Sequence, residues 1–165
     1  MHNWNVSRIN NYELSIINYE LKERRITMVE IRLMTINDWK GVEQVWKDHE
    51  GTNPVDDCEE GFTRYLKRNP TTSFVAMDGD KMIGTILAGH DGRRGFFHHV
   101  VVAPEYRNRG IGEDLVNHAM EALEKEGIQK TALVVFEHND LGNGFWEHIG
   151  FTTRPDLVYR NKYVK

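Results

Sequence analysis

The chain has 165 residues, of which 28% are charged and 39% hydrophobic, and its formal net charge at pH 7 is −4. These values fit one globular domain with a buried core, and the negative balance argues against the global positive field that binds nucleic acid. The single cysteine, Cys58, excludes an internal disulfide, and no apolar run approaches the roughly 20 residues that span a bilayer. We therefore expect a cytoplasmic protein without a nucleic-acid or membrane partner.

The first 27 residues differ in character from the rest of the chain. They contain the repeated tetrapeptide Asn-Tyr-Glu-Leu, and no cap or turn signal clearly frames a helix. The codons of residues 22–25 can form an AGGAGG-like ribosome-binding sequence at a short spacing before Met28. We predict that residues 1–27 are translated upstream sequence and that residues 28–165 form one domain. The alternative is a genuine N-terminal helix, such as an arm in a dimer.

After Met28, one strand and two helices are predicted. Alternating apolar and charged residues indicate a strand over residues 29–34. Thr35 and Asp38 form an approximate capping box, and apolar residues at helical spacing then predict a helix to about residue 47. Asp56 is the expected N-cap of a second helix, which an Asn-Pro pair ends.

Three further strands follow the second helix. Turn residues at 78–80 separate a strand over residues 72–77 from a strand over residues 81–88. A second turn at 91–95 leads to a strand over residues 96–103. Short turns join antiparallel neighbours, so this region predicts an antiparallel meander.

A glycine-bearing turn connects the last of these strands to a helix. Gly110 and Gly112 lack side chains, which lets a ligand approach the backbone closely. The first amides of the following helix are unpaired and lie at its positive end, and Arg107 and Arg109 add positive charge beside them. The turn therefore suits a phosphate or pyrophosphate group.

The remaining elements complete a mixed α/β fold. The helix after the turn ends at Gly127, and residues 131–136 predict a strand buried on both faces. A strand joined to the next by a crossover helix runs parallel to it. A short helix at 144–149 and last strands that include residues 157–163 follow. The fold class is α/β with a mixed sheet: an antiparallel meander, then a locally parallel strand pair, with about four helices.

Two motifs resemble those of the GNAT (Gcn5-related) N-acetyltransferases. Residues 107–112, Arg-Asn-Arg-Gly-Ile-Gly, are similar to the family pattern Arg/Gln-x-x-Gly-x-Gly/Ala between a strand and a helix. Asn139 and residues 145–151, Phe-Trp-Glu-His-Ile-Gly-Phe, resemble the family's Asn…Phe-Tyr-Glu-x-x-Gly-Phe. The resemblance covers residues 28–165 and implies the GNAT-like acyltransferase fold, in which the two parallel strands splay apart.

The resemblance also implies acetyl-CoA as the cosubstrate, and no metal. The backbone of one splayed strand would bind the pantetheine arm as if it were a neighbouring strand, and the amides of the turn would hold the pyrophosphate. The cleft would lie between the strand ending at Val102 and the strand ending near Phe136. The implied acetyl-CoA-binding residues are Val100, Val101, Val102, Arg107, Asn108, Arg109, Gly110, Ile111, Gly112, Glu113, Asn139 and Trp146.

Acetyl transfer to an amine needs a base for the amine proton and benefits from an acid for the departing thiolate. In proteins similar to this one the acid is usually a tyrosine, whose position is taken here by Trp146. An indole N–H cannot supply a proton at neutral pH. Tyr159, on a predicted late strand, is a candidate acid, and direct expulsion of the thiolate or a water molecule are the other substitutes.

For the base, the sequence offers His98 and His99, which alternation along a strand would place on opposite faces. His98 would share its face with Val100 and Val102. It also matches a position at which some amine-acetylating members of the family carry histidine, and its ordinary pKa near ~6.5 suits proton transfer. His98 is thus the candidate base, with a packed structural histidine as the alternative. Two weaker candidates follow the other splayed strand: Glu137 and His138.

The predicted function is an N-acetyltransferase that moves an acetyl group from acetyl-CoA to a primary amine of a small molecule or peptide, by direct attack in a ternary complex. Acidic residues within 49–60, near the expected acceptor side, could favour a cationic amine, although solvated helix ends are the better explanation of them. The alternative function is a non-catalytic acyl-CoA-binding sensor or partner module, which Trp146 motivates. A homodimer is a further expectation, because dimers are common among similar proteins.

Overall fold

The computed structural model describes residues 15, 29–47, 49 and 51–164. Apart from Ser15, the segment predicted to be an upstream extension lies outside the described residues. The chain divides after Ala132 into two compact units, which are treated separately below. Within the described part of the chain, no helix is both long and apolar enough to cross a membrane.

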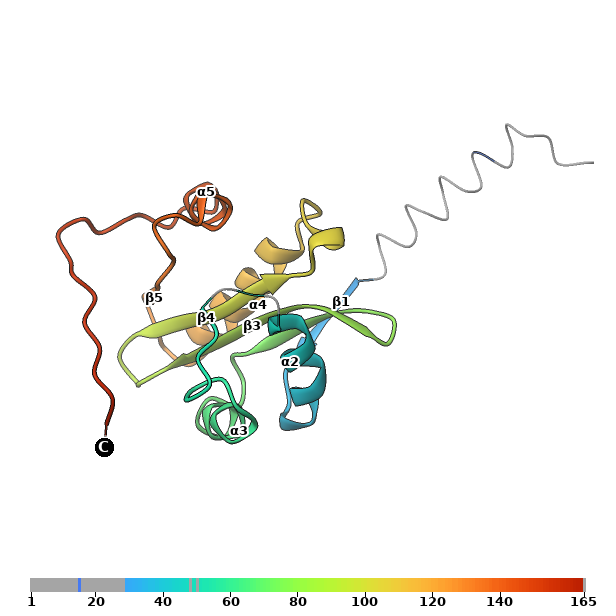
Figure 1. Ribbon diagram of the computed structural model, residues 1–165, viewed down its shortest axis with the longest axis horizontal. Coiled ribbons are helices and arrows are strands. Elements are labelled where there is room, and N and C mark those ends of the chain that lie inside the picture. Colours follow the sequence, from blue (N-terminus) through green and yellow to red (C-terminus); the bar gives the residue numbers. More distant parts are fainter. Residues whose placement is uncertain (1–14, 16–28, 48, 50, 165) are drawn as a thin grey trace, which may run out of the picture. The chain divides into compact units, whose positions relative to one another are not determined.

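A five-stranded sheet with the order β1-β2-β3-β4-β5 organises the first unit (Figure 1). Successive strands from the first to the fourth pair antiparallel. The amide of Gly95, which begins the fourth strand, donates to the carbonyl of Lys130 just before the fifth at 2.9 Å, so these two strands run parallel. The order confirms the predicted meander and parallel pair. The strands are β1 (Val29–Leu33), β2 (Phe74–Asp78), β3 (Lys81–His90), β4 (Gly95–Val102) and β5 (Thr131–Leu133).

Helices cover both faces of this sheet. The helices α2 (Trp39–Trp46) and α3 (Glu59–Arg68) lie on one face, and α4 (Ile111–Lys125) lies on the other (Figure 1). Short 3-10 helices, η1 (Ile36–Asp38) and η2 (Pro104–Tyr106), precede α2 and follow β4. The core under α2 and α3 joins residues from both helices to residues of β2, β3 and β4: Val42, Trp46, Phe62, Leu66, Val75, Leu87 and Val101.

The predicted capping box at the start of the first helical segment is confirmed. A carboxylate oxygen of Asp38 accepts hydrogen bonds from the Thr35 amide at 2.7 Å and the Thr35 hydroxyl at 3.0 Å. Arg32 of β1 donates to both carboxylate oxygens at 2.9 and 2.7 Å. Burial acts to raise the pKa of Asp38, but the hydrogen bonds from Arg32 and Thr35 outweigh it and hold the pKa below its usual value. The charged edge of β1 is thereby tied to the helical layer.

Asp56 is not the N-cap of the second helix, so that prediction is wrong. The helix begins at Glu59, and Cys58 occupies the N-cap position. Asn53 instead gathers the preceding residues into a turn, because its carbonyl accepts from the amides of Asp56 and Asp57 at 3.0 and 2.8 Å. These hydrogen bonds use the backbone before the helix and delay the helix start.

β4 contains a bulge that simple alternation does not predict. Thr85 of β3 lies opposite Val101, whereas Leu87 lies opposite His98, so β4 has one extra residue between these pairs. Within the bulge His99 adopts a φ of +45°, in the left-handed region. The extra residue shifts the alternation of every side chain that follows it.

The predicted sharing of faces along β4 is therefore wrong. His98 shares its face with Val101, beneath α2 and α3, and not with Val102. Val102 lies opposite Gly84, where an added Cβ would approach Leu115 of α4 at 3.2 Å. The bulge also leaves the side chain of His99 under α2, on the same side as His98 rather than the opposite one.

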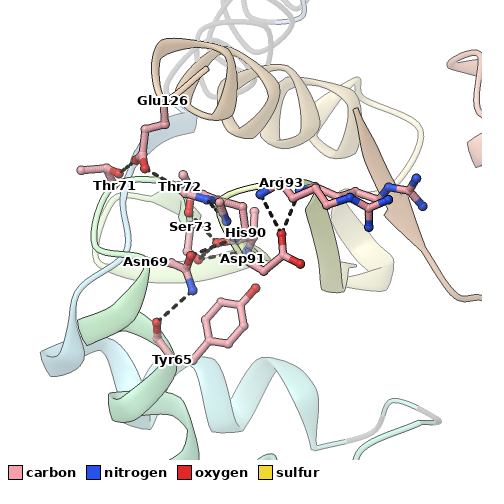
Figure 2. Close-up of polar contacts among 12 residues, drawn as sticks. Tyr65, Asn69, Thr71, Thr72, Ser73, His90, Asp91, Arg93 and Glu126 are labelled. Atoms are coloured by element: carbon pink, nitrogen blue, oxygen red, sulfur yellow. Dashed lines mark hydrogen bonds and ion pairs between the residues drawn. The ribbon is translucent and has the colours of Figure 1, made fainter. Parts of the chain in front are cut away.

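Polar contacts close the end of the sheet where β3 turns into β4 (Figure 2). The Asn69 side-chain oxygen accepts from the His90 amide at 2.9 Å. The Nδ1 atom of His90 accepts from the Gly92 amide at 3.0 Å, and its Nε2 lies 2.6 Å from the Glu126 carboxylate. Thr71 contacts the same carboxylate. These contacts join the ends of α3, β3 and α4 into one network.

From β5 onward, the structure departs from the prediction in the bounds of one strand and one helix, the helix lying in the second unit. The helix α5 (Asp140–His148) begins earlier than the predicted residue 144, because the Asn139 side chain caps it by accepting from the Gly142 amide at 2.9 Å. β5 covers only the first half of the predicted strand, and Val134 and Phe136 are exposed, so the prediction of a strand buried on both faces is wrong.

The predicted last strands are also wrong for the residues that the structure describes. No strand is found between residues 151 and 164. Arg154 and Asp156 form a local ion pair at 2.7 Å, and Leu157 donates to the Arg154 carbonyl at 3.1 Å across the intervening proline. A proline lacks the amide hydrogen that a sheet ladder needs. In this turn the backbone hydrogen bonds instead to residues close by in the sequence.

A buried hydrogen-bond chain holds the bulge in place. The Trp46 indole N–H donates to the Thr85 hydroxyl at 3.0 Å, and that hydroxyl donates to the His99 carbonyl at 3.0 Å. Thr85 is fully buried. One hydroxyl therefore satisfies a donor from α2 and an acceptor from the bulge that have no access to bulk water.

Replacing Thr85 by valine keeps the shape of the side chain and removes both hydrogen bonds. We expect Thr85→Val to lower the free energy of unfolding by about 1–3 kcal/mol, because a donor and an acceptor remain buried and unpaired. Urea denaturation measures this loss, with Thr63→Val on the half-buried side of α3 as the matched control. A loss of less than about 0.5 kcal/mol in Thr85→Val would show that the chain contributes little to stability.

Candidate functional site

The turn between β4 and α4 has the backbone geometry of an anion-binding site. Asn108 and Gly110 adopt left-handed φ values of +59° and +79°. The first i to i−4 bond of the helix runs from the Asp114 amide to the Gly110 carbonyl at 3.0 Å, so the amides of residues 111–113 have no partner within the helix. They lie at the positive end of a 15-residue helix. The turn can therefore bind a phosphate group.

Space above the turn is open on the side of Gly110. A Cβ added to Gly110 would meet no atom within 4 Å. A ligand can therefore reach the backbone there without displacing a side chain. This open backbone and the unpaired amides of the helix fit the pyrophosphate of a coenzyme.

The two predicted flanking arginines lie at this turn, and each is anchored to backbone. The Nε of Arg107 donates to the Val102 carbonyl at 3.0 Å, which ties the turn to the end of β4. Arg109 donates to the Glu105 carbonyl at 2.8 Å, and its guanidinium lies 5.1 Å from the centre of the Tyr106 ring. The positive charge of both side chains is thus held beside the helix N-terminus.

The three valines before the turn form the end of β4, and their side chains do not all point to the same face of the sheet. Val101 is buried, whereas Val100 and Val102 are half-buried. Val101 and Val102 are in register with Thr85 and Gly84 of β3 on one edge of the strand. Backbone groups alternate between the two edges of a strand, so others point to the edge on the side of β5.

His98 has the environment expected of a proton acceptor. Its ring lies between those of Tyr65, at 5.8 Å and nearly perpendicular, and Phe96, at 4.7 Å. The residue is exposed at the surface. The surrounding atoms nevertheless exclude enough water that burial lowers the pKa of His98, and the neighbouring His99 lowers it further. A neutral imidazole at pH 7 can accept a proton.

A contact between His99 and Asp57 was not predicted from the sequence. The Nε2 of His99 lies 2.8 Å from a carboxylate oxygen of Asp57, and both side chains are largely buried. Burial acts to raise the pKa of Asp57, but hydrogen bonds from His99 and the Asn53 amide outweigh it and keep the pKa below its usual value. The only sequence signal was the acidic character of the loop, because 42 residues separate the two partners.

Three predicted site residues belong to the second unit. Asn139 caps α5 through its side chain. Trp146 packs edge-on against Phe145 and Phe151, with ring centres 5.0 Å apart in each case. Tyr159 is exposed and lies outside any strand. Their roles toward acetyl-CoA stay predictions, whereas the first unit joins His98, the valines and the glycine turn on one continuous segment.

Known proteins resemble this chain over most of its length. The sequence model of the acetyltransferase (GNAT) family matches residues 39–151. A protein named acetyltransferase from Pectobacterium atrosepticum is 30% identical over 137 residues, which cover 83% of this chain and 97% of that protein.

Solved structures share the fold. The PaiA N-acetyltransferase from Thermoplasma acidophilum in complex with coenzyme A has a TM-score of 0.64 at 19% identity, and the match covers 76% of this chain and 91% of that chain. AAC(6')-Iy in complex with the bisubstrate analogue CoA-S-monomethyl-acetylneamine has a TM-score of 0.63 at 20% identity, and the match covers 82% and 99%. The family match spans the helices α2 to α5, the strands β2 to β5 and the glycine turn, and the chain therefore belongs to the acetyltransferase (GNAT) family.

Proposed function

We propose that this acetyltransferase moves an acetyl group from acetyl-CoA to a primary amine of a small molecule or peptide, by direct attack in a ternary complex. The observation that carries the proposal is the exposed imidazole of His98, whose pKa the surrounding atoms lower, on the strand that leads into the glycine turn and the N-terminus of α4. The fold neighbours solved with coenzyme A and with a CoA-acetylneamine analogue support the choice of cosubstrate and of an amine acceptor. A cytoplasmic location and a homodimer belong to the same proposal.

Acetyl-CoA would supply an activated acetyl thioester, and the chain would supply binding groups. The amides of residues 108–113 would hold the pyrophosphate, with positive charge from Arg107 and Arg109. Backbone groups of Val100, Val101 and Val102 on the free edge of β4 would bind the pantetheine arm. Asn139 and Trp146 complete the proposed cofactor residues through the second motif.

The proton of the amine would pass to His98, directly or through a water molecule. An alkyl amine is mostly protonated at pH 7, since its pKa lies near ~10.4, and only the neutral form is a nucleophile. A neutral imidazole beside the acceptor would take this proton before the nitrogen attacks the thioester carbonyl, and the nitrogen would lose its second proton as the C–S bond breaks and the amide forms. Because Trp146 cannot donate a proton to the departing thiolate, the thiolate would leave unassisted, or with a proton from water or from Tyr159.

Acetyl-CoA is expected to raise the melting temperature of the protein. At a hundredfold excess over its dissociation constant, binding adds roughly 2.7 kcal/mol of stability, or about 5–10 °C for a chain of this size. Gly110→Ala would place a methyl group in the open space above the turn, and we expect it to reduce this shift by more than half. Differential scanning fluorimetry measures the shift, with ATP as the ligand control.

Gly127→Ala is the matched variant for this experiment. Gly127 lies at the other end of α4 with a φ of +80°, close to the +79° of Gly110, and an added Cβ there also meets no atom within 4 Å. Both variants should lose similar intrinsic stability, since alanine is strained at these angles. An equal acetyl-CoA shift in both variants would contradict binding at the turn, and the absence of any shift in the unaltered protein would remove acetyl-CoA from the proposal.

His98→Gln is expected to lower kcat/KM by about 100-fold or more, because glutamine cannot accept the amine proton. In the unaltered protein, kcat/KM should fall as the pH drops through the His98 pKa, which burial places below about 6.5. Release of free CoA thiol from acetyl-CoA measures the rate across a panel that contains spermidine, tyramine, lysine and neamine.

His118→Gln serves as the control, because His118 lies on α4 and contacts Phe74 on the other face of the sheet. We expect its rate and pH profile to match those of the unaltered protein. If His98→Gln kept its full rate, or kept the same acid limb, the base would have to be another group.

Trp146 favours a second candidate function, a non-catalytic acyl-CoA-binding sensor or partner module. Its ring is packed between two phenylalanines, and it replaces the tyrosine that usually serves as the acid. A sensor would show the acetyl-CoA melting shift but no amine-dependent release of thiol. Trp146→Tyr restores the usual acid, and a gain of turnover in this variant alone would support the sensor over the enzyme.

A further inference from the structure

The contact between Asp57 and His99 joins two segments that are far apart in the sequence. Asp57 lies in the turn before α3, and His99 lies in the bulge of β4. The contact is 2.8 Å long, and only 15% of the His99 side chain and 12% of the Asp57 side chain are exposed. At this depth the interaction is weakly screened by water, so it constrains both segments more than a surface ion pair would.

The carboxylate end of this contact is fixed by its own turn. The second oxygen of Asp57 accepts from the Asn53 amide at 2.6 Å. The Asn53 carbonyl accepts from the amide of Asp57, and the Asn53 side-chain oxygen accepts from the Val55 amide at 3.1 Å. Residues 53–57 therefore form a compact unit, which moves with the carboxylate.

The imidazole end is fixed by the core. The His99 ring stacks on Trp46 with centres 4.1 Å apart, and the His99 carbonyl accepts the buried Thr85 hydroxyl. The backbone φ of +45° is unfavourable for a residue with a side chain, although histidine tolerates it better than most. Such strain persists only where the surroundings determine it, and it is common at functional sites.

The contact also determines what His98 faces. Tyr65 of α3 and Phe96 of β4 lie against its ring, and His99 follows it in the chain. The negative charges of Asp57 and Asp56 act on the His98 imidazole from the turn before α3. The turn thus brings two carboxylates near the proposed base, and their negative charge would favour an amine that approaches as a cation.

We propose that Asp57 and His99 are positioning residues that dock the turn of residues 53–58 onto the β4 bulge and so build the acceptor side of the His98 site for a cationic amine. The proposal rests on the proposed acetyltransferase function. It adds that neither partner touches the reacting atoms and that their effect on the reaction passes through the position of the turn. Loss of the contact would free the turn while the acetyl-CoA turn of α4, which shares no contact with the pair, stays intact.

The test compares Asp57→Asn, His99→Asn and the double variant in the full chain. Asparagine tolerates a positive φ, so His99→Asn removes the ring without adding backbone strain. We expect hydrogen exchange of residues 53–58 to rise about tenfold in each single variant and no further in the double variant, because both remove the same contact. Asp56→Asn removes a charge from the same turn and weakens only its 3.3 Å hydrogen bond from the Asn53 side chain, so it should raise this exchange by less than either variant of the contact.

The kinetic measurement separates positioning from stability. For the fastest amine of the panel, KM should rise about tenfold in Asp57→Asn and His99→Asn, while KM for acetyl-CoA stays within about twofold. Asp56→Asn should raise KM for the amine by less. If the contact had a purely structural role, its loss would change KM for the amine and KM for acetyl-CoA by the same factor. This outcome, or unchanged hydrogen exchange in the turn, would overturn the proposal. If no amine reacts and acetyl-CoA does not stabilise the unaltered protein, the proposed function fails, whereas the exchange data still judge the docking contact.

Discussion

The bulge of β4 is the constraint on which the arrangement of the site depends. One buried hydroxyl, that of Thr85, receives the indole N–H of Trp46 and donates to the carbonyl of His99. This links the α2 layer, the central strand β3 and the strained residue of β4 at a single point. Because the bulge resets alternation, it decides that His98 and Val101 lie under α2 and α3 and that Val102 lies on the α4 face.

Local patterns predicted most of the first unit. The alternation in β1, the Thr35–Asp38 capping box and the glycine turn are each written within a few neighbouring residues, and the structure confirms them. The bulge is different, because its partners Trp46 and Thr85 come from other elements. No sequence pattern within β4 distinguishes a bulged strand from a regular one. The sequence therefore wrongly predicted that His98 and Val102 share a face of the sheet.

The predicted site divides in the same way. The geometry of the glycine turn depends on its own glycines and on the helix that follows, so the sequence was sufficient to predict that geometry. The Asp57–His99 contact joins a loop to a strand and could not be found from either. In the second unit the capping role of Asn139 was not predicted, because its motif suggested a cofactor contact instead. The strands predicted after residue 151 rested on apolar residues alone, which do not show whether a partner strand is present.

The bulge gives two adjacent histidines different surroundings on the same face of the sheet. His99 is stacked on Trp46 and bound to Asp57, so its nitrogen is committed to holding the fold. His98 is exposed and contacts two rings, and the surrounding atoms lower its pKa. In a regular strand one of the two would face α4. The extra residue keeps both under the same helices, so the carboxylate that fixes His99 also acts on His98. The fold contact and the position of the proposed base thus depend on one backbone irregularity.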